Sequence, residues 1–317
     1  MNILITGGAG FIGSNLTKHY LENTNHKITV VDRCVKNIGR LETMCKELRE
    51  FDIVQEDYDN VRHEIVDGKD AIVHLAAVPR VAFSVEHPSS TTYDNIYKTT
   101  RLLEVLKNRE DNQTKFVFAS SSSIYGDASM PTSEDHKLSP QSPYALQKKC
   151  GEELCKMFSN LYDTNTVSLR FFNVFGPHQH VDSAYATVMA KWCDQLKKGE
   201  PLRLEGDGSQ SRDFSYVDNV VRGIDLAATS EKRFNGESYN IANQDRTSLN
   251  DVLDFLRQRF DFEVESFEPR QGDVKHTQAN ISKATNELSY TPVCNVWDGL
   301  QKTIEWWGLK EKAHVDY

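Results

Sequence analysis

A glycine-rich turn near the N-terminus constrains the fold of this chain more than any other feature. Residues 7–13 read Gly-Gly-Ala-Gly-Phe-Ile-Gly, after a short β-branched run at residues 2–6 and before apolar residues at helical spacing. Gly7, Gly10 and Gly13 let the backbone turn tightly, approach a pyrophosphate and pack a helix against a sheet. The start of that helix also offers free N–H groups and partial positive charge, so the turn predicts a dinucleotide site.

A carboxylate follows at the expected distance. Asp32 ends the second apolar run, residues 27–32, and lies 19 residues after Gly13. In that place it can accept hydrogen bonds from the adenosine ribose hydroxyls, which favours NAD over NADP. The neighbouring Arg33 weighs against this preference. The alternative interpretation is a structural glycine turn followed by a solvent-facing aspartate.

The rest of the chain predicts an α/β protein. Short apolar runs at residues 51–55, 71–75, 115–119 and 167–172 alternate with helical patterns such as residues 91–106. This alternation is typical of a Rossmann-like, doubly wound parallel sheet covered on both faces. Beyond residue 172 glycine, proline and polar residues become denser. We therefore expect a cofactor-binding domain at residues 1–173 and a smaller substrate-binding lobe at 174–317, interleaved with the first.

The composition of the chain argues against some kinds of binding partner. The chain has 37 Lys and Arg against 46 Asp and Glu, a net charge of −9, which argues against nucleic acid or an anionic membrane as partner. No stretch approaches the roughly 20 apolar residues of a membrane span, and the N-terminus shows no signal-peptide core. The six cysteines have no zinc-site spacing, so we expect no metal, no disulfide framework and a cytoplasmic location.

Tyr144 and Lys148 are the candidate catalytic pair. They stand four residues apart, so a helix would place both on one face. A free phenol has a pKa of about 10, and a nearby ammonium favours the phenolate and lowers that pKa. Tyr144 could then take a proton from a substrate hydroxyl while hydride leaves the same carbon. Taken alone, such a pair is also an ordinary helix face.

A serine cluster supports the catalytic interpretation. Residues 120–123 are all serine and follow the run at 115–119, where open α/β sheets place ligands. A hydroxyl there could bridge the phenol and the substrate oxygen. The alternative is a polar exit from the strand.

Together these residues resemble the extended short-chain dehydrogenase/reductase superfamily, and within it the NAD-dependent epimerase/dehydratase family, which acts on nucleotide sugars. The resemblance covers nearly the whole chain. It is strongest at residues 6–13, 74–77, 120–126, 142–148, 169–176, 206–218 and 270–274. Within this family, the chain most resembles the UDP-N-acetylhexosamine and hexosaminuronate 4-epimerases.

The resemblance implies a role for each matching position. For the cofactor, NAD, the implied contacts are Gly7, Gly10, Phe11, Ile12, Asp32, Asp57, Leu75, Ala76, Ala77, Tyr144 and Lys148. Ser121 takes the Ser/Thr position of a catalytic trio with Tyr144 and Lys148. For the UDP-sugar, the implied contacts are Ser84, Ser121, Ser122, Tyr144, Asn173, Arg212, Arg270, Asp273 and Thr277. One departure is Lys98, where many relatives carry glycine, which puts the local helix packing in question.

The residues after Ser121 favour one reaction. Dehydratases of this family carry an Asp-Glu pair there and UDP-glucuronate decarboxylases usually a Glu, whereas this chain has Ser122 and Ser123. Without those acids, oxidation and reduction at C4 remain, which is all that 4-epimerisation needs. Thr277 stands where relatives restricted to UDP-glucose and UDP-galactose carry a tyrosine, so it leaves volume for an N-acetyl group. The sequence thus favours a UDP-GlcNAc/UDP-GalNAc 4-epimerase that also accepts UDP-Glc and UDP-Gal.

Three points stay open at this stage. A 4,6-dehydratase or UDP-glucuronate decarboxylase is the alternative enzyme, and a non-catalytic NAD-binding regulator is the alternative outside enzymes. The family commonly forms homodimers through two helices per subunit, here residues 91–106 and 142–158. Apolar residues on those helices could serve that interface or the core: Leu102, Leu103, Leu106, Leu154 and Phe158.

Overall fold

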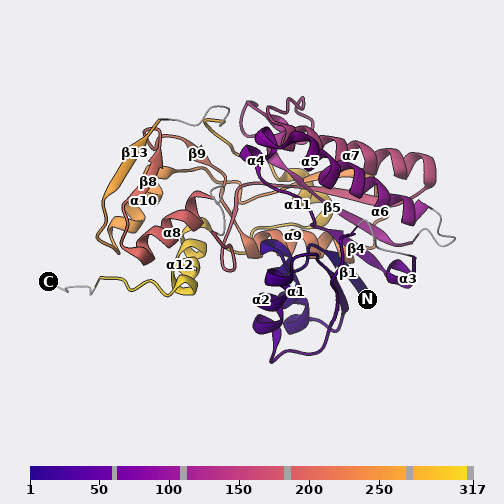
Figure 1. Ribbon diagram of the computed structural model, residues 1–317. Helices are drawn as coiled ribbons and strands as arrows, with labels where there is room; N and C mark the ends of the chain where they lie inside the picture. The colour runs from indigo at the N-terminus through magenta and orange to yellow at the C-terminus, as the bar shows by residue number, and fades with distance from the viewer. Residues whose placement is uncertain (59–62, 108–112, 182–186, 269–273, 313–317) are drawn as a thin grey trace.

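A seven-stranded parallel sheet forms the centre of the protein (Figure 1). The computed structural model describes residues 1–58, 63–107, 113–181, 187–268 and 274–312. The strand order is β11-β6-β5-β4-β1-β2-β3, which makes it a doubly wound parallel sheet of the kind that the sequence predicts. The strands are β1 (Asn2–Thr6), β2 (Lys27–Val31), β3 (Asp52–Val54), β4 (Ala71–His74), β5 (Lys115–Ser121), β6 (Asn165–Phe171) and β11 (Asn235–Ile241).

Each central strand is buried on both faces, as a parallel sheet between helices requires. Along β1, Ile3 and Ile5 belong to one apolar cluster and Leu4 to the other. Helices α1 (Phe11–Asn23) and α9 (Val217–Thr229) cover the first face, with α2 (Val35–Cys45) beside α1. Helices α3 (His63–Val66), α6 (Lys98–Lys107) and α7 (Pro143–Tyr162) cover the other.

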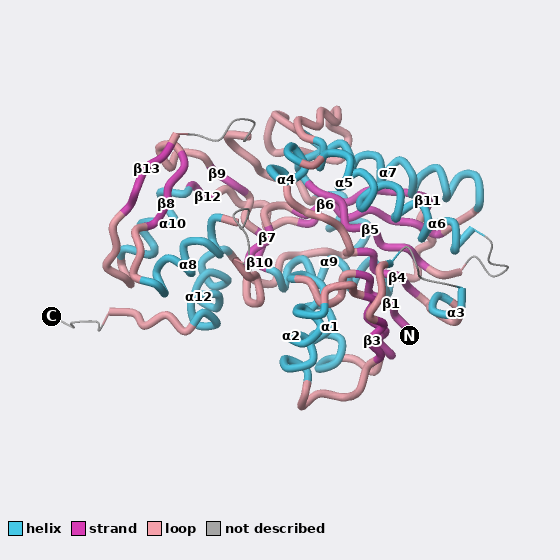
Figure 2. The backbone as a smooth tube through the Cα atoms, viewed as in Figure 1, coloured by secondary structure: helices cyan, strands magenta, loops and turns pink. Residues whose placement is uncertain are grey.

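The helix expected at residues 91–106 is built from successive pieces. They are the end of α5 (Pro88–Thr92), a π-helical turn η2 (Tyr93–Tyr97) and α6. A further short helix, α4 (Val81–Glu86), precedes them. A proline cannot continue a preceding helix without losing a hydrogen bond, and Pro88 stands at the start of α5. The pieces pack along α7, so together they form one wall above the sheet (Figure 2).

The second half of the chain returns to the sheet before it completes the smaller lobe. Strand β11 pairs in parallel with β6, and α9 packs across β4, β5 and β6. The sequence pattern does not mark β11 as a strand because Asn235, Glu237 and Ser238 make it polar, as an edge strand can be. This return explains why the two halves of the chain are interleaved.

The smaller lobe carries short strands and helices around the carboxyl edge of the sheet. Its strands are β7 (Val174–Phe175), β8 (Leu202–Glu205), β9 (Ser211–Arg212), β10 (Ser215–Tyr216), β12 (Thr247–Ser248) and β13 (Val264–Phe267). Its helices are α8 (Val188–Lys198), α10 (Leu249–Arg257) and α12 (Val296–Trp307), whereas α11 (Ser282–Leu288) packs against β11 of the central sheet. None of the helices in the described part of the chain is long and apolar enough to cross a membrane.

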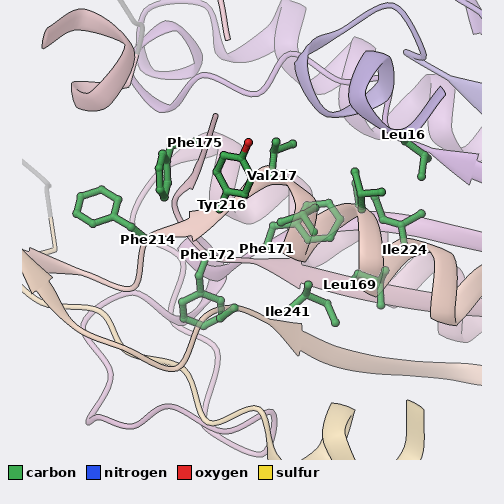
Figure 3. Close-up of a cluster of buried hydrophobic side chains, with 14 of the residues drawn as sticks. Leu16, Leu169, Phe171, Phe172, Phe175, Phe214, Tyr216, Val217, Ile224 and Ile241 are labelled. Carbon is green, nitrogen blue, oxygen red and sulfur yellow. The ribbon is translucent and has the colours of Figure 1, made fainter. Parts of the chain in front are cut away.

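One continuous core joins the lobe to the sheet (Figure 3). Phe171 and Phe172 at the end of β6 belong to the same buried cluster as Phe214 and Tyr216 from the lobe and Ile224 from α9. Burying such side chains stabilises the folded state by roughly 1.5–3 kcal/mol each. The lobe is therefore held firmly over the end of the sheet, where the sequence predicts the site.

Candidate active site

The glycine turn is shaped by close backbone contacts. Gly7 has a φ of +69°, and a Cβ there would lie 2.7 Å from the backbone nitrogen of Ala76. A Cβ on Gly13 would lie 2.3 Å from the carbonyl oxygen of Gly7. Only glycine fits both positions, and α1 then begins at Phe11 with its N–H groups toward a cavity of about 760 Å³.

Asp32 closes β2 beside this turn. Its carboxylate accepts hydrogen bonds from the backbone N–H groups of Ala9 at 3.1 Å and Cys34 at 2.9 Å, which fix its orientation. Burial raises the pKa of Asp32, and these backbone hydrogen bonds oppose the shift. Arg33 points elsewhere and pairs with Asp57 at 2.9 Å and Asp94 at 3.0 Å. The arginine that weighed against NAD is thus already paired with carboxylates of the chain.

Lys98 completes a cluster of four charges at this end of the cavity. Its side chain is only 6% exposed and forms ion pairs with Asp57 and with Asp94, the latter at 2.9 Å. The departure from glycine is therefore accommodated, since the helix continues through Lys98 after the π-helical turn η2. Asp57 keeps one buried oxygen, Oδ1, without a hydrogen-bond partner. That free acceptor fits the exocyclic amino group of an adenine, so the residues present suit NAD.

Tyr144 and Lys148 share the first two turns of α7. Ser142 caps this helix, its hydroxyl accepting from the backbone N–H of Ala145 at 3.2 Å, and Pro143 begins it. The ammonium of Lys148 donates to the carbonyl of Ala119 at 2.7 Å, and Nζ lies 5.9 Å from the centre of the Tyr144 ring. Both residues line the cavity, as the sequence predicts.

The ionisation of the pair differs from the expectation that Lys148 lowers the pKa of the phenol. Burial raises the pKa of Tyr144 to about 12, and a hydrogen bond with Ser121 only partly offsets it. Burial also lowers the pKa of Lys148 to about 8. In the chain by itself, removal from water is the largest influence on the pKa of both groups. Tyr144 therefore needs a further positive charge before it can act as a base near neutral pH.

The serines lie at the carboxyl end of β5. Ser121 ends the strand, and its hydroxyl accepts hydrogen bonds from the backbone N–H and the hydroxyl of Ser123, at 3.2 and 3.0 Å. Its contact with the Tyr144 phenol places it where a bridging hydroxyl is needed. Ser122 also lines the cavity.

Three further residues of the cavity come from the end of β6 and from the lobe. Asn173, Arg212 and Thr277 all line it, although they come from three separate segments. The amide of Asn173 donates to the hydroxyl of Thr277 at 3.1 Å, and that hydroxyl also accepts from the backbone N–H of Asp213 at 3.2 Å. One nitrogen of Arg212 donates to the carbonyls of Ser211 and Lys275. These residues are thus held in place before any ligand binds.

The remaining predicted site residues lie as follows. The cavity is also lined by Gly7, Gly10, Phe11, Ile12, Asp32, Asp57, Leu75, Ala76 and Ala77. Ser84 is fully buried and does not line it. Its hydroxyl accepts from the backbone N–H of Tyr144 at 3.0 Å and donates to the carbonyl of Val81 at 2.6 Å, so it positions Tyr144 from behind. Arg270 and Asp273 lie outside the described residues, and their contacts with the UDP moiety stay predictions.

Comparison with protein families agrees with this geometry. The model of the NAD dependent epimerase/dehydratase family matches residues 3–242, which is most of the chain. The chain belongs to this family. Its cofactor is NAD, and the glycine turn, Asp32 and Asp57 are the residues that would hold it.

Individual members of the family match over nearly their whole length. The Bacillus subtilis (strain 168) protein YtcB, described as an uncharacterized UDP-glucose epimerase, is 35% identical over 314 residues, covering 96% of this chain and 97% of YtcB. The UDP-glucuronic acid 4-epimerase of Bacillus cereus, solved with UDP-glucuronic acid and NAD, superposes with a TM-score of 0.89 at 32% identity, covering 97% and 99% of the two chains. The UDP-N-acetylglucosamine 4-epimerase of Methanobrevibacter ruminantium M1, solved with UDP-N-acetylmuramic acid, gives 0.86 at 33%, covering 96% and 97%.

The structure adds residues that the sequence analysis of this epimerase/dehydratase family member did not find. Asp94 joins the charge cluster beside Asp57, and Arg80 lines the cavity. Asn95 is fully buried among polar groups and holds the loop after β4, accepting from the backbone N–H of Val78 at 2.8 Å. No local pattern marks these residues, because their partners lie far away in the sequence. The one signal available was Lys98, which stands where many relatives carry glycine, because a lysine that becomes buried there requires a carboxylate nearby.

Proposed function

We propose that the protein is an NAD-dependent UDP-sugar 4-epimerase that interconverts UDP-GlcNAc and UDP-GalNAc and also accepts UDP-Glc and UDP-Gal. The observation that carries the proposal is one cavity that is lined by Ser121, Tyr144 and Lys148, by the cofactor turn and by Thr277. The named epimerases among its relatives and structural neighbours support the reaction class. These proteins are named for different UDP-sugars, so the sugar proposed for this chain has to be argued from its own residues.

Tyr144 is the proposed acid–base residue. When bound, NAD supplies the hydride acceptor and a positively charged nicotinamide ring. That charge favours the phenolate of Tyr144, which burial alone disfavours. The phenolate takes the proton of the C4 hydroxyl as hydride leaves C4, and Ser121 holds the sugar oxygen by a hydrogen bond. The 4-keto sugar then presents its other face, hydride returns to C4, and Tyr144 gives the proton back to the oxygen.

Lys148 acts through position and charge. Its hydrogen bond to the Ala119 carbonyl holds the ammonium under the tyrosine, one helical turn from the phenol. Because burial lowers the pKa of Lys148 to about 8, the ammonium is still the main form at pH 7. It therefore contributes positive charge to the site during each turnover.

The groups near Ser121 argue for epimerisation over water loss or decarboxylation. Among the described residues that line the cavity, the carboxylates are Asp32, Glu56, Asp57 and Asp94. They follow β2 and β3 or lie in η2, on the side of the sheet that holds the charge cluster. Ser122 and Ser123 are the residues next to Ser121, and neither can act as a carboxylic acid near neutral pH. A dehydratase needs such an acid beside C5 and C6.

Thr277 supports the choice of an N-acetylated sugar. It lines the cavity with a small side chain whose hydroxyl is held by Asn173 and Asp213, which leaves its methyl group as the free part. In this proposal, the volume that a tyrosine would fill at this position accommodates the 2-substituent of the sugar. Arg212 lies on the same wall, where a guanidinium suits the diphosphate.

A product assay tests this proposal. The purified protein is incubated with UDP-GlcNAc, and NMR follows the appearance of the axial C4 product, UDP-GalNAc. Mass spectrometry of the same mixture detects a 6-deoxy-4-keto sugar, and UDP-glucuronate as substrate tests for loss of carbon dioxide. If no UDP-hexose of any kind is converted, the proposed epimerase activity is wrong.

We further propose a homodimer formed through α7 and the α5–η2–α6 wall. The leucines considered for the interface, Leu102, Leu103 and Leu106, are instead buried in the core of the subunit, as is Phe158, with Leu154 half-buried against it. A different set of large apolar side chains is exposed on these helices: Tyr93, Tyr97, Leu146, Met157, Leu161 and Tyr162. An exposed apolar patch of this kind is typical of an interface.

All six cysteines are free, which suits a reducing compartment such as the cytoplasm.

A further inference from the structure

Lys98 is a buried cation to which the mechanism above gives no part. Its side chain is only 6% exposed, and its ammonium forms ion pairs with Asp57 and with Asp94. The ammonium also lies 5.4 Å from the centre of the Tyr93 ring and 5.8 Å from the centre of the Tyr58 ring. Removing an ammonium from water costs free energy unless the charge is paired. The fold therefore holds this cation between two carboxylates and two aromatic rings, although Lys98 is not among the described residues that line the cavity.

Asp57 is the partner through which Lys98 can reach a ligand, because Asp57 lines the cavity. One carboxylate oxygen of Asp57, Oδ2, accepts from both cations, from the ammonium of Lys98 and from Nη1 of Arg33 at 2.9 Å. The other oxygen, Oδ1, is buried and has no hydrogen-bond partner in the described part of the chain. The two cations thus fix one side of the carboxylate and leave the other side as an acceptor.

The two cations that hold Asp57 are not equivalent. Burial raises the pKa of Asp57, but the hydrogen bonds from Lys98 and Arg33 outweigh burial and lower this pKa overall, so Asp57 is a carboxylate near neutral pH. The side chain of Arg33 is 51% exposed, whereas that of Lys98 is 6% exposed. An ion pair that is open to water contributes little to the free energy of a fixed geometry. Lys98 is therefore the cation that does most to hold the carboxylate of Asp57.

We propose that Lys98 is a positioning residue for the cofactor: it holds Asp57 so that Oδ1 accepts from the exocyclic amino group of the adenine of NAD. A carboxylate can only accept hydrogen bonds, and the amino group of adenine is a donor. Hypoxanthine has a carbonyl oxygen in place of this amino group, and two acceptors that face each other cannot bond. The site should therefore select adenine over hypoxanthine, and Lys98 should set the size of that selectivity. This inference concerns the cofactor and goes beyond the proposed function, because it does not depend on which sugar is converted.

Two dinucleotides that differ in this group of the purine test the proposal. We would measure by calorimetry the Kd of nucleotide-free protein for NAD and for nicotinamide hypoxanthine dinucleotide. The wild-type protein should bind NAD about 10- to 100-fold more tightly, since the analogue leaves a buried acceptor unpaired. Lys98→Met should weaken the binding of NAD by about tenfold and change the binding of the analogue by less than about threefold. Lys98→Arg keeps the charge and should retain part of the selectivity.

Two further variants separate this role from a loss of fold or of charge in general. Arg101→Met removes a cation from the same helix, α6, where the side chain is 52% exposed, and should leave both Kd values unchanged. Lys98→Met combined with Asp94→Asn removes one charge of each sign from the cluster and leaves Arg33 paired with Asp57. This double variant should lose the selectivity as Lys98→Met does, and it provides the same test if Lys98→Met alone does not fold. The melting temperature shows which variants are folded.

The ratio of the two Kd values decides the outcome. A wild-type protein that does not prefer NAD would show that Oδ1 of Asp57 does not meet the adenine. Equal weakening of both dinucleotides in Lys98→Met would make Lys98 a structural residue, and unchanged binding would leave it without a part in cofactor recognition. Each of these results overturns the proposal. The experiment measures no turnover, so a lack of epimerase activity would contradict the proposed function and leave this inference intact.

Discussion

The buried ammonium of Lys148 should cost the folded protein stability at neutral pH. Burial lowers the pKa of Lys148 from 10.5 to about 8, and one pH unit of pKa difference corresponds to about 1.4 kcal/mol. Below pH 8 the folded state therefore loses about 3 kcal/mol by holding this group charged. Between about pH 8 and 10.5 the unfolded chain binds more protons than the folded one, so the stability rises with pH and the cost disappears. At pH 9.5 about 1.4 kcal/mol of it remains.

Lys148→Met removes this titration while keeping a long apolar side chain. The variant also loses the hydrogen bond to Ala119, whose contribution to the free energy of unfolding does not change with pH. Its free energy of unfolding relative to the wild-type protein should therefore fall by about 2 kcal/mol between pH 7 and 9.5. Urea denaturation of nucleotide-free protein at both pH values measures this difference. Lys149→Met, next to Lys148 but on a less buried face of α7, serves as the matched control and should keep the wild-type slope.

One result would refute this reasoning. If wild-type and Lys148→Met stabilities change in parallel between pH 7 and 9.5, the pKa of Lys148 is the same in the folded and the unfolded protein. The lowering of this pKa by burial would then be wrong, although the group would still be an ammonium near neutral pH.

Four further changes test the site and the assembly. Tyr144→Phe should lower kcat by about 10²- to 10⁴-fold with bound NAD retained, as measured by turnover and by nucleotide released on denaturation; unchanged turnover would instead favour a protein in which Tyr144 has no catalytic part. Gly13→Ala places a methyl group 2.3 Å from the Gly7 carbonyl and should abolish NAD binding in calorimetry, whereas binding of normal strength would contradict the close packing described. Thr277→Tyr should lose UDP-GlcNAc and keep UDP-Glc in paired kinetic assays, and equal loss of both would rule out its role in selecting the sugar. Leu161→Arg, at a side chain that is 66% exposed, should convert the dimer to a monomer in light scattering without changing the melting temperature of the subunit, and an unchanged mass would place the interface elsewhere.

The sequence by itself determined the parts of this protein that depend on neighbours along the chain. The glycine turn before Asp32 follows from the backbone freedom of Gly7. Tyr144 and Lys148 share one face of α7 because they are four residues apart. The apolar runs form the sheet because its strands must be buried on both faces. The sequence did not predict the edge strand β11, because its side chains are polar and only its pairing with β6 identifies it as a strand.

The tertiary structure decided what depends on burial and on partners distant in sequence. Only the assembled site shows that the pKa of Tyr144 rises, because desolvation depends on how every surrounding segment packs. Only it shows that Ser84 bonds the backbone N–H of Tyr144 and does not line the cavity. It also shows that the Nη1 nitrogen of Arg80 is buried with no hydrogen-bond partner among the described residues. Spacing along a chain fixes which residues share a helix face, but the free energy of a charge depends on all the atoms around it, and these are brought together only by the fold.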